Sequence, residues 1–407
     1  MGNNRERIGQ KSCWHAIQTY IINRKNFFGR QGDASPLPPK MPRYKSMREW
    51  ENKVRKVVPY TPGEQPNEPD MIKLNTNENP YPPSPRVIEA LRAVRPESLK
   101  LYPDPTAGNL VRALAEYHGV DESRVFVGVG SDDVLAMCFL TFFQSGKPIL
   151  FPDITYSFYD VWAELFQIPY KKMPLNEDFE IVTEDYTAQT EETGGIIFPN
   201  PNAPTGIELG QNEIEEIVRR NTDKIVIVDE AYVDFGATSA VHLLDRYDNL
   251  IVVRTFSKSR ALAGMRIGYA LGSPDAIRYL NDAKYSFNSY TMDETALAAG
   301  KASVEDETYF RDMLDRVIST REWTKQELRK LGFRFADSKA NFIFASHPSC
   351  PAKRLFEALR EAHIYVRYFN KPRIDNYLRI TVGTRTEMET FIKFLEKYLS
   401  DEGIHEK

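Results

Sequence analysis

Short apolar runs separated by amphipathic segments dominate the chain from about residue 104 to residue 292. The runs are continuous and rich in β-branched residues, which is typical of strands buried on both faces of a sheet. They lie at 124–130, 148–151, 194–198, 224–230 and 249–256. Between them, apolar residues recur at helical spacing at 110–119, 131–143, 157–167 and 211–220. This alternation predicts a mainly parallel α/β sheet with helices on both faces.

The pattern changes after about residue 293. A long helical repeat runs to Leu331, with Glu, Lys and Arg at its exposed positions. Shorter elements follow: a strand at 341–346, a helix at 352–362, strands around 364–367 and 377–382, and a helix at 387–399. This mixture indicates a smaller α+β domain. Before the sheet, the proline-rich segment 77–85 is expected to be extended and to lead into a helix at 86–94.

Composition narrows the class of protein. The chain has 407 residues, 42% hydrophobic and 27% charged, which is enough for a large core in two lobes. Its net charge of −4 gives no polyanion-binding signal, so we expect no nucleic-acid partner. Cys13, Cys138 and Cys350 are too few and too scattered for a disulfide framework or a zinc site, which favours a reducing cytoplasm and no bound metal. No apolar run is long enough to span a membrane, so no membrane association is expected.

Residues 1–46 differ from the rest of the chain. They carry nine Lys or Arg and two Asp or Glu, a net charge of +7, which leaves −11 on the remaining residues. A basic, acid-poor start resembles a transit peptide. We favour an appended leader or an upstream translation start, with Met47 as the more natural beginning. A secretory apolar region and a small-residue cleavage site are both missing.

Unusual polar residues fall at the ends of the predicted strands, where ligands bind in open α/β sheets. Ser257 and Lys258 follow the run at 249–256, and Arg266 comes eight residues after the lysine. The segment GVGSDD, 128–133, opens a helix whose N–H groups could hold a phosphate. Taken alone, each has an ordinary explanation. A lysine after a strand usually marks the exit into solvent, and Ser131 could be an N-cap.

A carboxylate stands at the end of another buried run. In KIVIVDEAYVDF, 224–235, Asp229 closes the apolar residues and Tyr232 follows. A buried carboxylate is costly unless it is paired, so we expect a cationic partner. The loop FPNPNAPTG, 198–206, could present the amide of Asn202, or be an ordinary rigid turn. Together these groups predict a planar, phosphorylated aldehyde with a cationic ring nitrogen, a description that fits pyridoxal 5′-phosphate.

Five motifs in order resemble those of fold-type I pyridoxal-phosphate aminotransferases: NENPYPPSP, NPNAPTG, DEAYVDF, RTFSKSRALAGMRIGY and YLRITVG. The chain is most similar to the histidinol-phosphate aminotransferase branch, and the resemblance covers about residues 47–400. It implies that family's fold, a mainly parallel large-domain sheet with helices on both faces plus a smaller α+β domain. Threonine-phosphate decarboxylases and aromatic amino acid aminotransferases look similar and stay open as alternatives.

The resemblance implies roles for the residues around the cofactor. Lys258 would form the Schiff base and shuttle the proton, and Asp229 would pair with the ring nitrogen. Asn202 and Tyr232 would bond the phenolic oxygen of the ring, and Tyr156 would stack on it. The residues expected around the phosphate are Gly130, Ser131, Asp132, Thr255, Ser257 and Arg266. The family's usual Gly-Ala-Asp/Asn-Glu type of turn reads GSDD here, a departure that should preserve the backbone donors.

The resemblance also implies a substrate site shared between two subunits. Tyr102, in LYPDP, matches a tyrosine that reaches the phosphate of the neighbouring subunit's cofactor, which implies a homodimer. Arg379 matches the arginine that clamps the substrate carboxylate, and Arg367 matches a second substrate arginine. Tyr81 lies near the position of a tyrosine at the far end of the substrate, where the family often reads NEN or NEY before proline. Asn202 is expected to contact the substrate as well.

The implied activity is a ping-pong transfer of the amino group from histidinol phosphate to 2-oxoglutarate. The expected domains are an extension at 1–46, a segment at 47–103 that packs with the small domain and the dimer partner, a large domain at 104–292 and a small domain at 293–407. A non-catalytic cofactor-binding regulator, with residues 1–46 as a nucleic-acid arm, is a remote alternative. The filled catalytic positions and the lack of a helix-turn-helix pattern before residue 47 argue against it.

Overall fold

The computed structural model describes residues 49–188 and 190–404, and it divides into two units, Met1–Lys56 and Val57–Lys407. The described residues of the first unit include an exposed 3₁₀ turn, η1, at Glu49–Asn52. The predictions made for residues 1–46, including Cys13, lie outside the described residues. The second unit carries the elements described below.

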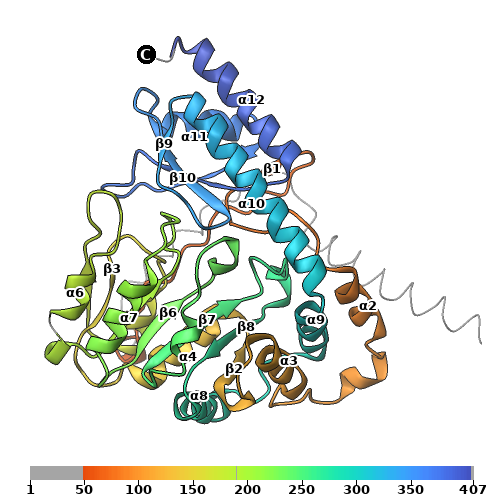
Figure 1. Cartoon of the computed structure of the whole chain (residues 1–407), viewed down its shortest axis with the longest axis vertical. Helices are drawn as coiled ribbons and strands as arrows, with labels where there is room; N and C mark the ends of the chain where they lie inside the picture. The colour runs from red at the N-terminus through yellow and green to blue at the C-terminus, as the bar shows by residue number, and fades with distance from the viewer. Residues whose placement is uncertain (1–48, 189, 405–407) are drawn as a thin grey trace, which may run out of the picture. The chain divides into compact units, whose positions relative to one another are not determined.

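A seven-stranded sheet forms the centre of the second unit (Figure 1). Strand β8 runs antiparallel to its neighbours β2 and β7, and the other adjacent pairs are parallel. In spatial order the strands are β2 (Val125–Gly128), β8 (Gly268–Leu271), β7 (Leu250–Thr255), β6 (Val226–Asp229), β5 (Gly195–Pro199), β3 (Ile149–Pro152) and β4 (Tyr170–Met173). The carboxyl ends of β5, β6 and β7 therefore meet at one edge of the sheet, which is where the candidate site lies.

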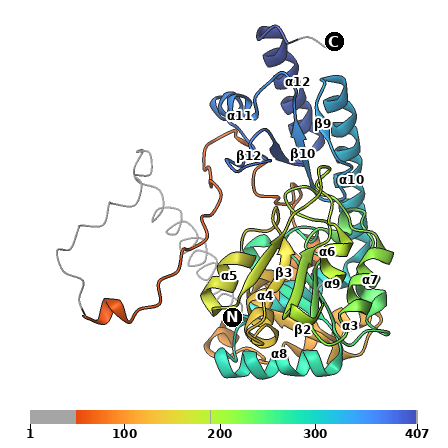
Figure 2. The same ribbon diagram turned by 90° about the vertical axis from the view of Figure 1, so that its left-hand side faces the viewer.

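Alternate residues of the buried strands belong to two different hydrophobic cores. Ile196 and Phe198 of β5 join one core, whereas Ile197 between them joins the other. The first core includes residues of α3 (Gly108–His118), α7 (Gln211–Arg220) and α9 (Glu294–Glu305). The second includes residues of α4 (Gly130–Phe142), α5 (Tyr159–Phe166) and α8 (Pro274–Phe287). The sheet is therefore covered by helices on both faces, as continuous apolar strands require (Figure 2).

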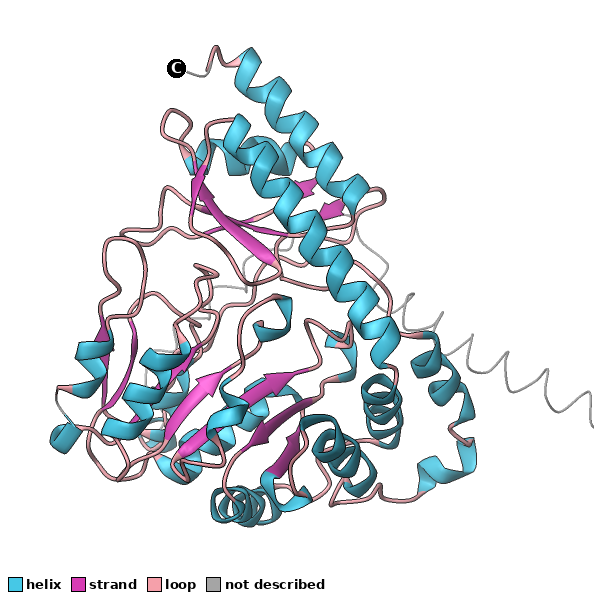
Figure 3. Ribbon diagram, viewed as in Figure 1, coloured by secondary structure: helices cyan, strands magenta, loops and turns pink. Residues whose placement is uncertain are grey.

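The C-terminal part forms a second, smaller layer with its own core (Figure 3). Its antiparallel sheet has the order β12 (Arg367–Tyr368), β13 (Leu378–Thr381), β10 (Phe342–Ser346) and β9 (Arg334–Phe335). The helices here are α10 (Glu307–Lys330), α11 (Ala352–Glu361) and α12 (Arg385–Asp401). Residues of all three helices pack with β10 and β13 in one core.

The segment before the large sheet connects the two layers. Strand β1 (Ile72–Lys73) pairs in parallel with β11 (Ile364–Tyr365) of the C-terminal part. Helix α2 (Pro85–Ala93), which Ser84 caps and Pro85 begins, packs against α9. The 3₁₀ turn η2 (Pro96–Lys100) follows α2. Elsewhere in the chain, the short helix α6 (Thr183–Thr187) packs beside α7.

The predicted fold class is confirmed: the large sheet is mostly parallel, and a smaller α+β layer follows it. Two details differ from the sequence prediction. The long helical repeat after residue 293 is two helices, α9 and α10, which meet at Asp306. Strands β4 and β8 were not foreseen, since β4 lies at the sheet edge with exposed lysines and β8 is only four residues long. Within the described residues, no helix combines the length and apolarity needed to cross a bilayer.

Candidate active site

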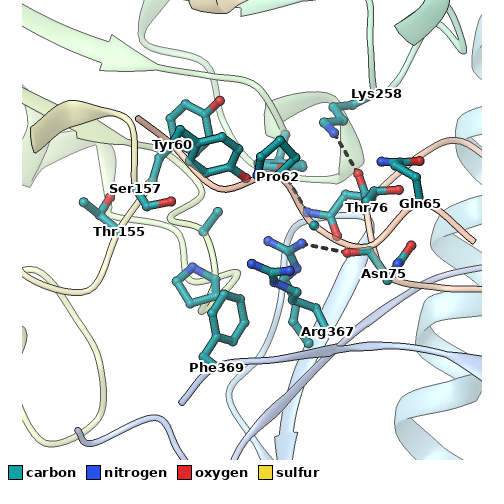
Figure 4. A pocket seen from close by; sticks show the side chains of 17 residues that line it. Tyr60, Pro62, Gln65, Asn75, Thr76, Thr155, Ser157, Lys258, Arg367 and Phe369 are labelled. Carbon is teal, nitrogen blue, oxygen red and sulfur yellow. Dashed lines mark hydrogen bonds between the residues drawn. The ribbon is translucent and has the colours of Figure 1, made fainter. Parts of the chain in front are cut away.

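Two adjoining cavities lie at the carboxyl edge of the large sheet and share Lys258 and Tyr232 among their lining residues. The first, which we call the Asp229 cavity, is also lined by Asp229, by residues at the start of α4 and by Arg266. The second, the arginine cavity, is also lined by Arg367 and Arg379 of the C-terminal sheet (Figure 4). The structure thus gathers predicted residues from strand ends far apart in the sequence.

Lys258 lies just beyond the end of β7 and reaches into both cavities. Its ammonium Nζ donates to the backbone oxygen of Thr76, at 3.1 Å (Figure 4). Its backbone is held as well, because the side-chain amide of Asn79 donates to the carbonyl oxygens of Lys258 and Ser259, at 3.1 and 3.3 Å. The lysine is therefore directed into a cavity rather than into bulk solvent, which excludes the ordinary explanation of a strand exit.

Asp229 closes β6 and is buried, with 4% of its surface exposed. The hydroxyl of Tyr159 donates to one carboxylate oxygen at 2.8 Å, and the backbone N–H of Ala231 donates to the other at 3.3 Å. Burial raises the pKa of Asp229 to about 6, and these two hydrogen bonds offset only part of that effect. Within the described residues, Asp229 forms no ion pair. A cation placed at this carboxylate would lower its pKa again.

Tyr232, three residues after Asp229, presents its ring and hydroxyl to both cavities. The side-chain amide of Asn77 donates to the Tyr232 hydroxyl at 2.9 Å, and the Lys258 ammonium lies 5.9 Å from the centre of the Tyr232 ring. Asn77 is itself held by Thr381, whose hydroxyl donates to the Asn77 oxygen at 3.1 Å. The segment before the large sheet and strand β13 therefore fix the tyrosine from outside the turn that carries it.

The turn at the start of α4 faces Arg266 across the Asp229 cavity. Helix α4 has no side-chain cap, so N–H groups of its first turn stay available to an anion. Gly130 adopts a φ of +82°, and a side chain there would come within 2.5 Å of the Arg266 guanidinium. Arg266 donates to Ser257 at 3.4 Å and to Asp132 at 3.3 Å. A side chain at Gly268, the first residue of β8, would collide with the backbone of Gly130. Glycine at position 268 is therefore what allows β8 and the start of α4 to lie this close together.

Of two other residues expected at the cofactor, Tyr156 lines the cavities and Asn202 does not. Tyr156 lines both cavities, and its hydroxyl donates to Asp132 at 2.7 Å. Asn202 is buried, and it is Ala203 that faces the two cavities. The Asn202 amide instead donates to the Ile154 carbonyl and to Thr205, at 3.0 and 3.1 Å. Asn202 is not among the described residues that line these two cavities, and its expected contact with the ligand stays a prediction.

Arg367 and Arg379 are directly opposite each other on the antiparallel strands β12 and β13. One Arg379 nitrogen donates to the backbone oxygen of Asn75 at 3.0 Å, while its Nε is buried without a hydrogen-bond partner. Burial lowers the pKa of Arg379, and the charge of Arg367 adds to that effect. No carboxylate of the described residues forms an ion pair with either arginine. The pair therefore offers two positive charges to an anionic ligand.

Thr255, also expected near the phosphate, lines the Asp229 cavity at the end of β7. Two expected site residues are not among the described residues that line either cavity. Tyr102 is 81% exposed and stacks on Tyr290, with ring centroids 4.5 Å apart. Tyr81 packs beside a core that contains Phe310, and the Arg316 guanidinium lies 5.8 Å from its ring centre.

The structure adds site residues that the sequence reasoning missed. Tyr159 contacts Asp229, and it stands only three residues after Tyr156 in the same DITYSFY stretch. Asn77, which holds Tyr232, belongs to the NENP motif, but the family resemblance implies no role for it. Tyr60, which lines the arginine cavity and stacks on Phe158 with centroids 4.2 Å apart, comes from an irregular segment with no periodic signal.

Comparison with known proteins shows the family to which this chain belongs. Residues 69–395 match the family Aminotransferase class I and II. Histidinol-phosphate aminotransferase of Lactococcus lactis subsp. cremoris (strain MG1363) is 52% identical over 352 residues, which are 86% of this chain and 98% of that protein. The enzyme of the same name from Clostridium beijerinckii is 49% identical over 352 residues, again 86% of this chain and 98% of that protein.

Solved structures share the fold at lower identity. A putative histidinol-phosphate aminotransferase from Erwinia carotovora atroseptica superposes with a TM-score of 0.76 at 24% identity, over 82% of this chain and 97% of that chain. Histidinol-phosphate aminotransferase from Sinorhizobium meliloti, in complex with pyridoxal-5′-phosphate, gives 0.74 at 22% identity, over 81% and 91%. The match to the family covers most of the chain and includes both cavities except for the segment around Tyr60. This chain belongs to the aminotransferase class I and II family.

Proposed function

We propose that this protein transfers the amino group of histidinol phosphate to 2-oxoglutarate, giving imidazole acetol phosphate and glutamate, with pyridoxal 5′-phosphate as cofactor. The observation that carries the proposal is the placement of Lys258 between a buried carboxylate and a pair of arginines, none of which has an ion-pair partner among the described residues. The curated relatives at about 50% identity bear the name of this activity.

The residues of the Asp229 cavity fit pyridoxal 5′-phosphate at each of its chemical groups. The uncapped first turn of α4 at Ser131, with Ser257 and Arg266 facing it, offers donors to a phosphate. Asp229, whose pKa burial raises to about 6, offers a carboxylate that a ring cation would stabilise. The Tyr232 hydroxyl, which accepts from Asn77, can donate its own proton to a ring oxygen.

When bound, pyridoxal phosphate supplies an aldehyde that captures the amine and a ring that accepts the electron pair of the α-carbon. Lys258 Nζ, at the junction of the two cavities, is the group placed to take the proton from the α-carbon and to return it. Asp229 would hold a positive charge at the ring nitrogen, and the hydrogen bonds from Tyr159 and from the Ala231 N–H fix the orientation of its carboxylate. Tyr156 forms the wall against which a planar group can stack.

The arginine cavity accounts for substrates that carry anions. Glutamate and 2-oxoglutarate bring two carboxylates, and histidinol phosphate brings a phosphate. Arg379, whose Nε is buried without a partner, offers a planar fork for a carboxylate, and Arg367 opposite it adds a second charge. Two adjacent guanidiniums can serve carboxylate and phosphate in turn, which is what a ping-pong reaction requires.

Two related activities use similar groups: decarboxylation of threonine phosphate, and amino transfer from aromatic amino acids. A panel of amino donors with 2-oxoglutarate separates them, with histidinol phosphate, phenylalanine and threonine phosphate as donors. We expect glutamate formation to be fastest with histidinol phosphate, without release of CO₂. A higher kcat/KM for phenylalanine would contradict the proposed substrate, and CO₂ from threonine phosphate would contradict the reaction type.

We further propose a homodimer with shared active sites. Tyr102 is exposed on this chain, and large apolar side chains around it and on α8 are exposed too: Leu99, Leu101, Tyr279, Tyr285, Phe287 and Tyr290. Exposed apolar patches of this kind mark interaction surfaces. A partner chain seated there would bury Tyr102 and could bring it to the partner's phosphate turn.

A cytoplasmic location agrees with the free thiols of Cys138 and Cys350, which are both buried and unpaired.

A further inference from the structure

Three charged side chains form a buried cluster behind the loop that carries Lys258. Arg254, near the end of strand β7, donates through Nε to Glu230 at 2.9 Å and through a terminal nitrogen to Asp234 at 3.3 Å. The exposed fractions of the side chains are 9% for Arg254, 0% for Glu230 and 22% for Asp234. Burial alone would disfavour the arginine charge, but Asp234 and Glu230 outweigh it and raise the pKa of Arg254.

The cluster joins the two chain segments that supply the reactive groups. Glu230 directly follows Asp229, and Asp234 lies in the 3₁₀ turn η5 (Val233–Phe235) that directly follows Tyr232. On the other side, Asp234 accepts from the hydroxyl of Ser259, at 2.6 Å, and Ser259 is the residue after Lys258. One hydrogen-bonded chain therefore runs from the Tyr232 turn to the Lys258 loop.

The cluster does not serve the cavities directly. Among the described residues that line the Asp229 and arginine cavities, Glu230, Asp234 and Arg254 are absent. Nor does stability alone explain the cluster, because a buried ion group is often no more stable than apolar residues of the same volume. Such a group does supply a fixed geometry, since the planar guanidinium donates to its two carboxylates in one arrangement.

We propose that Arg254, with Glu230 and Asp234, is a positioning unit that fixes the Lys258 loop against the Tyr232 turn. These residues hold Lys258 in reach of the cavity without contacting the ligand themselves. The inference rests on the proposed function only in that Lys258 must bond to the cofactor. It does not depend on which amino acid is the substrate.

The test measures how fast Lys258 captures the cofactor. Protein freed of cofactor is mixed with pyridoxal 5′-phosphate, and the growth of the visible absorbance of the lysine adduct gives a second-order rate. Asp234→Ala should slow this capture by about tenfold or more, because a displacement of about 1 Å of a reacting group is costly. In Asp234→Asn, the amide oxygen can still accept from Arg254, and the amide nitrogen can donate to the Ser259 hydroxyl. The capture rate of this variant should therefore stay within about threefold of that of the unchanged protein.

A matched control lies in the C-terminal part of the chain. Lys325 is fully buried and pairs with Glu322 at 2.8 Å and with Asp337 at 2.6 Å, so Asp337→Ala also removes one of two carboxylates from a buried cation. Asp337 lines neither the Asp229 cavity nor the arginine cavity among the described residues. Asp337→Ala should lower the melting temperature but leave the capture rate unchanged, which separates positioning from general loosening.

The outcomes distinguish the two proposals. Equal capture rates for Asp234→Ala and Asp337→Ala, both folded by circular dichroism, would overturn the positioning role. If Asp234→Ala fails to fold, Arg254→Lys decides, because lysine keeps the charge without the fork. The expected result is again slow capture, and a rate equal to that of the unchanged protein overturns the role. An unchanged protein that forms no adduct, or a Lys258→Ala variant that still forms one, would instead contradict the proposed function.

Discussion

The burial of the Asp229 carboxylate allows us to predict how the stability of the cofactor-free protein depends on pH. Burial raises the pKa of Asp229 from its ordinary value of 3.8 to about 6. The folded chain therefore binds this proton more tightly than the unfolded chain does. The contribution of this proton to the stability of the folded state is complete below pH 3.8 and is lost as the pH rises through about 6. Replacing Asp229 by asparagine removes the titration and should stabilise the cofactor-free protein near neutral pH.

The expected magnitude follows from the size of the pKa difference. A gap of about 2 pH units, at about 1.4 kcal/mol per unit, corresponds to about 3 kcal/mol of folding free energy. The asparagine of the Asp229→Asn variant resembles the protonated carboxyl group in shape, and its oxygen can still accept from Tyr159. The stability advantage of the variant should therefore be small near pH 4, rise up to about pH 6 and stay constant above it.

Urea unfolding of the cofactor-free protein between pH 4 and pH 8 measures this difference directly. Asp337→Asn is the control with the opposite sign, because hydrogen bonds from Lys325 and Lys339 hold the pKa of Asp337 down at about 2. That carboxylate contributes stability above pH 3.8 and loses it as the pH falls toward about 2, so its variant should be the less stable one at neutral pH. A difference between Asp229→Asn and the unchanged protein that does not vary with pH would refute the reasoning.

The same substitution should reduce activity while it raises stability. The ring nitrogen of the cofactor would lose its anionic partner, and removing one member of a buried charge pair costs about 3–5 kcal/mol. Steady-state rates of Asp229→Asn should therefore fall by at least about a hundredfold. A near-normal rate in this variant would show that Asp229 is not the ring partner.

Three further predictions concern the other groups of the site. Lys258→Ala should fold but lose the visible absorbance of the lysine adduct and all turnover; an imine reducible by borohydride in this variant would contradict the assignment. Arg379→Lys should raise the KM for 2-oxoglutarate by at least about tenfold, because lysine cannot form the planar fork, whereas an unchanged KM would place the carboxylate elsewhere. Mixing Tyr102→Ala chains with inactive Lys258→Ala chains should restore about a quarter of normal activity, because each mixed dimer has one intact site. Activity equal to the average of the two parents would mean that Tyr102 acts within its own chain or not at all.

Much of the fold and the family could be predicted from the sequence, because both depend on local signals. Continuous apolar runs and helical repeats indicated the mostly parallel sheet, and the match to the aminotransferase class I and II family confirms the resemblance seen in the motifs. Asp229 stands out because a carboxylate at the end of a buried strand is costly unless it is paired. Lys258, three residues past the end of β7, stands out only together with Ser257 and Arg266. Strand ends are also where a parallel sheet concentrates its chemistry.

The contributions from irregular segments could not be predicted in the same way. Asn77 holds Tyr232, which is 155 positions away in the chain, and Tyr60 lines the arginine cavity from a proline-rich stretch. Neither position belongs to a periodic pattern, so nothing local shows which way the side chain points. The same limit explains Asn202: its loop was recognised, but the turn directs Ala203 rather than the asparagine into the cavities.

The partner of Asp229 shows most clearly what the structure adds. The sequence requires a cation for this buried carboxylate, and Arg254 is a buried cation on the neighbouring strand. Asp229 is the last residue of β6 and Glu230 follows the strand; Asp229 accepts from Tyr159, whereas Glu230 accepts from Arg254. Asp229 pairs in register with Val253, and the arginine that follows is already held by Glu230 and Asp234. Within the described residues the chain thus supplies the cation for Glu230 but none for Asp229, and the missing charge is the one that a protonated pyridine ring would bring.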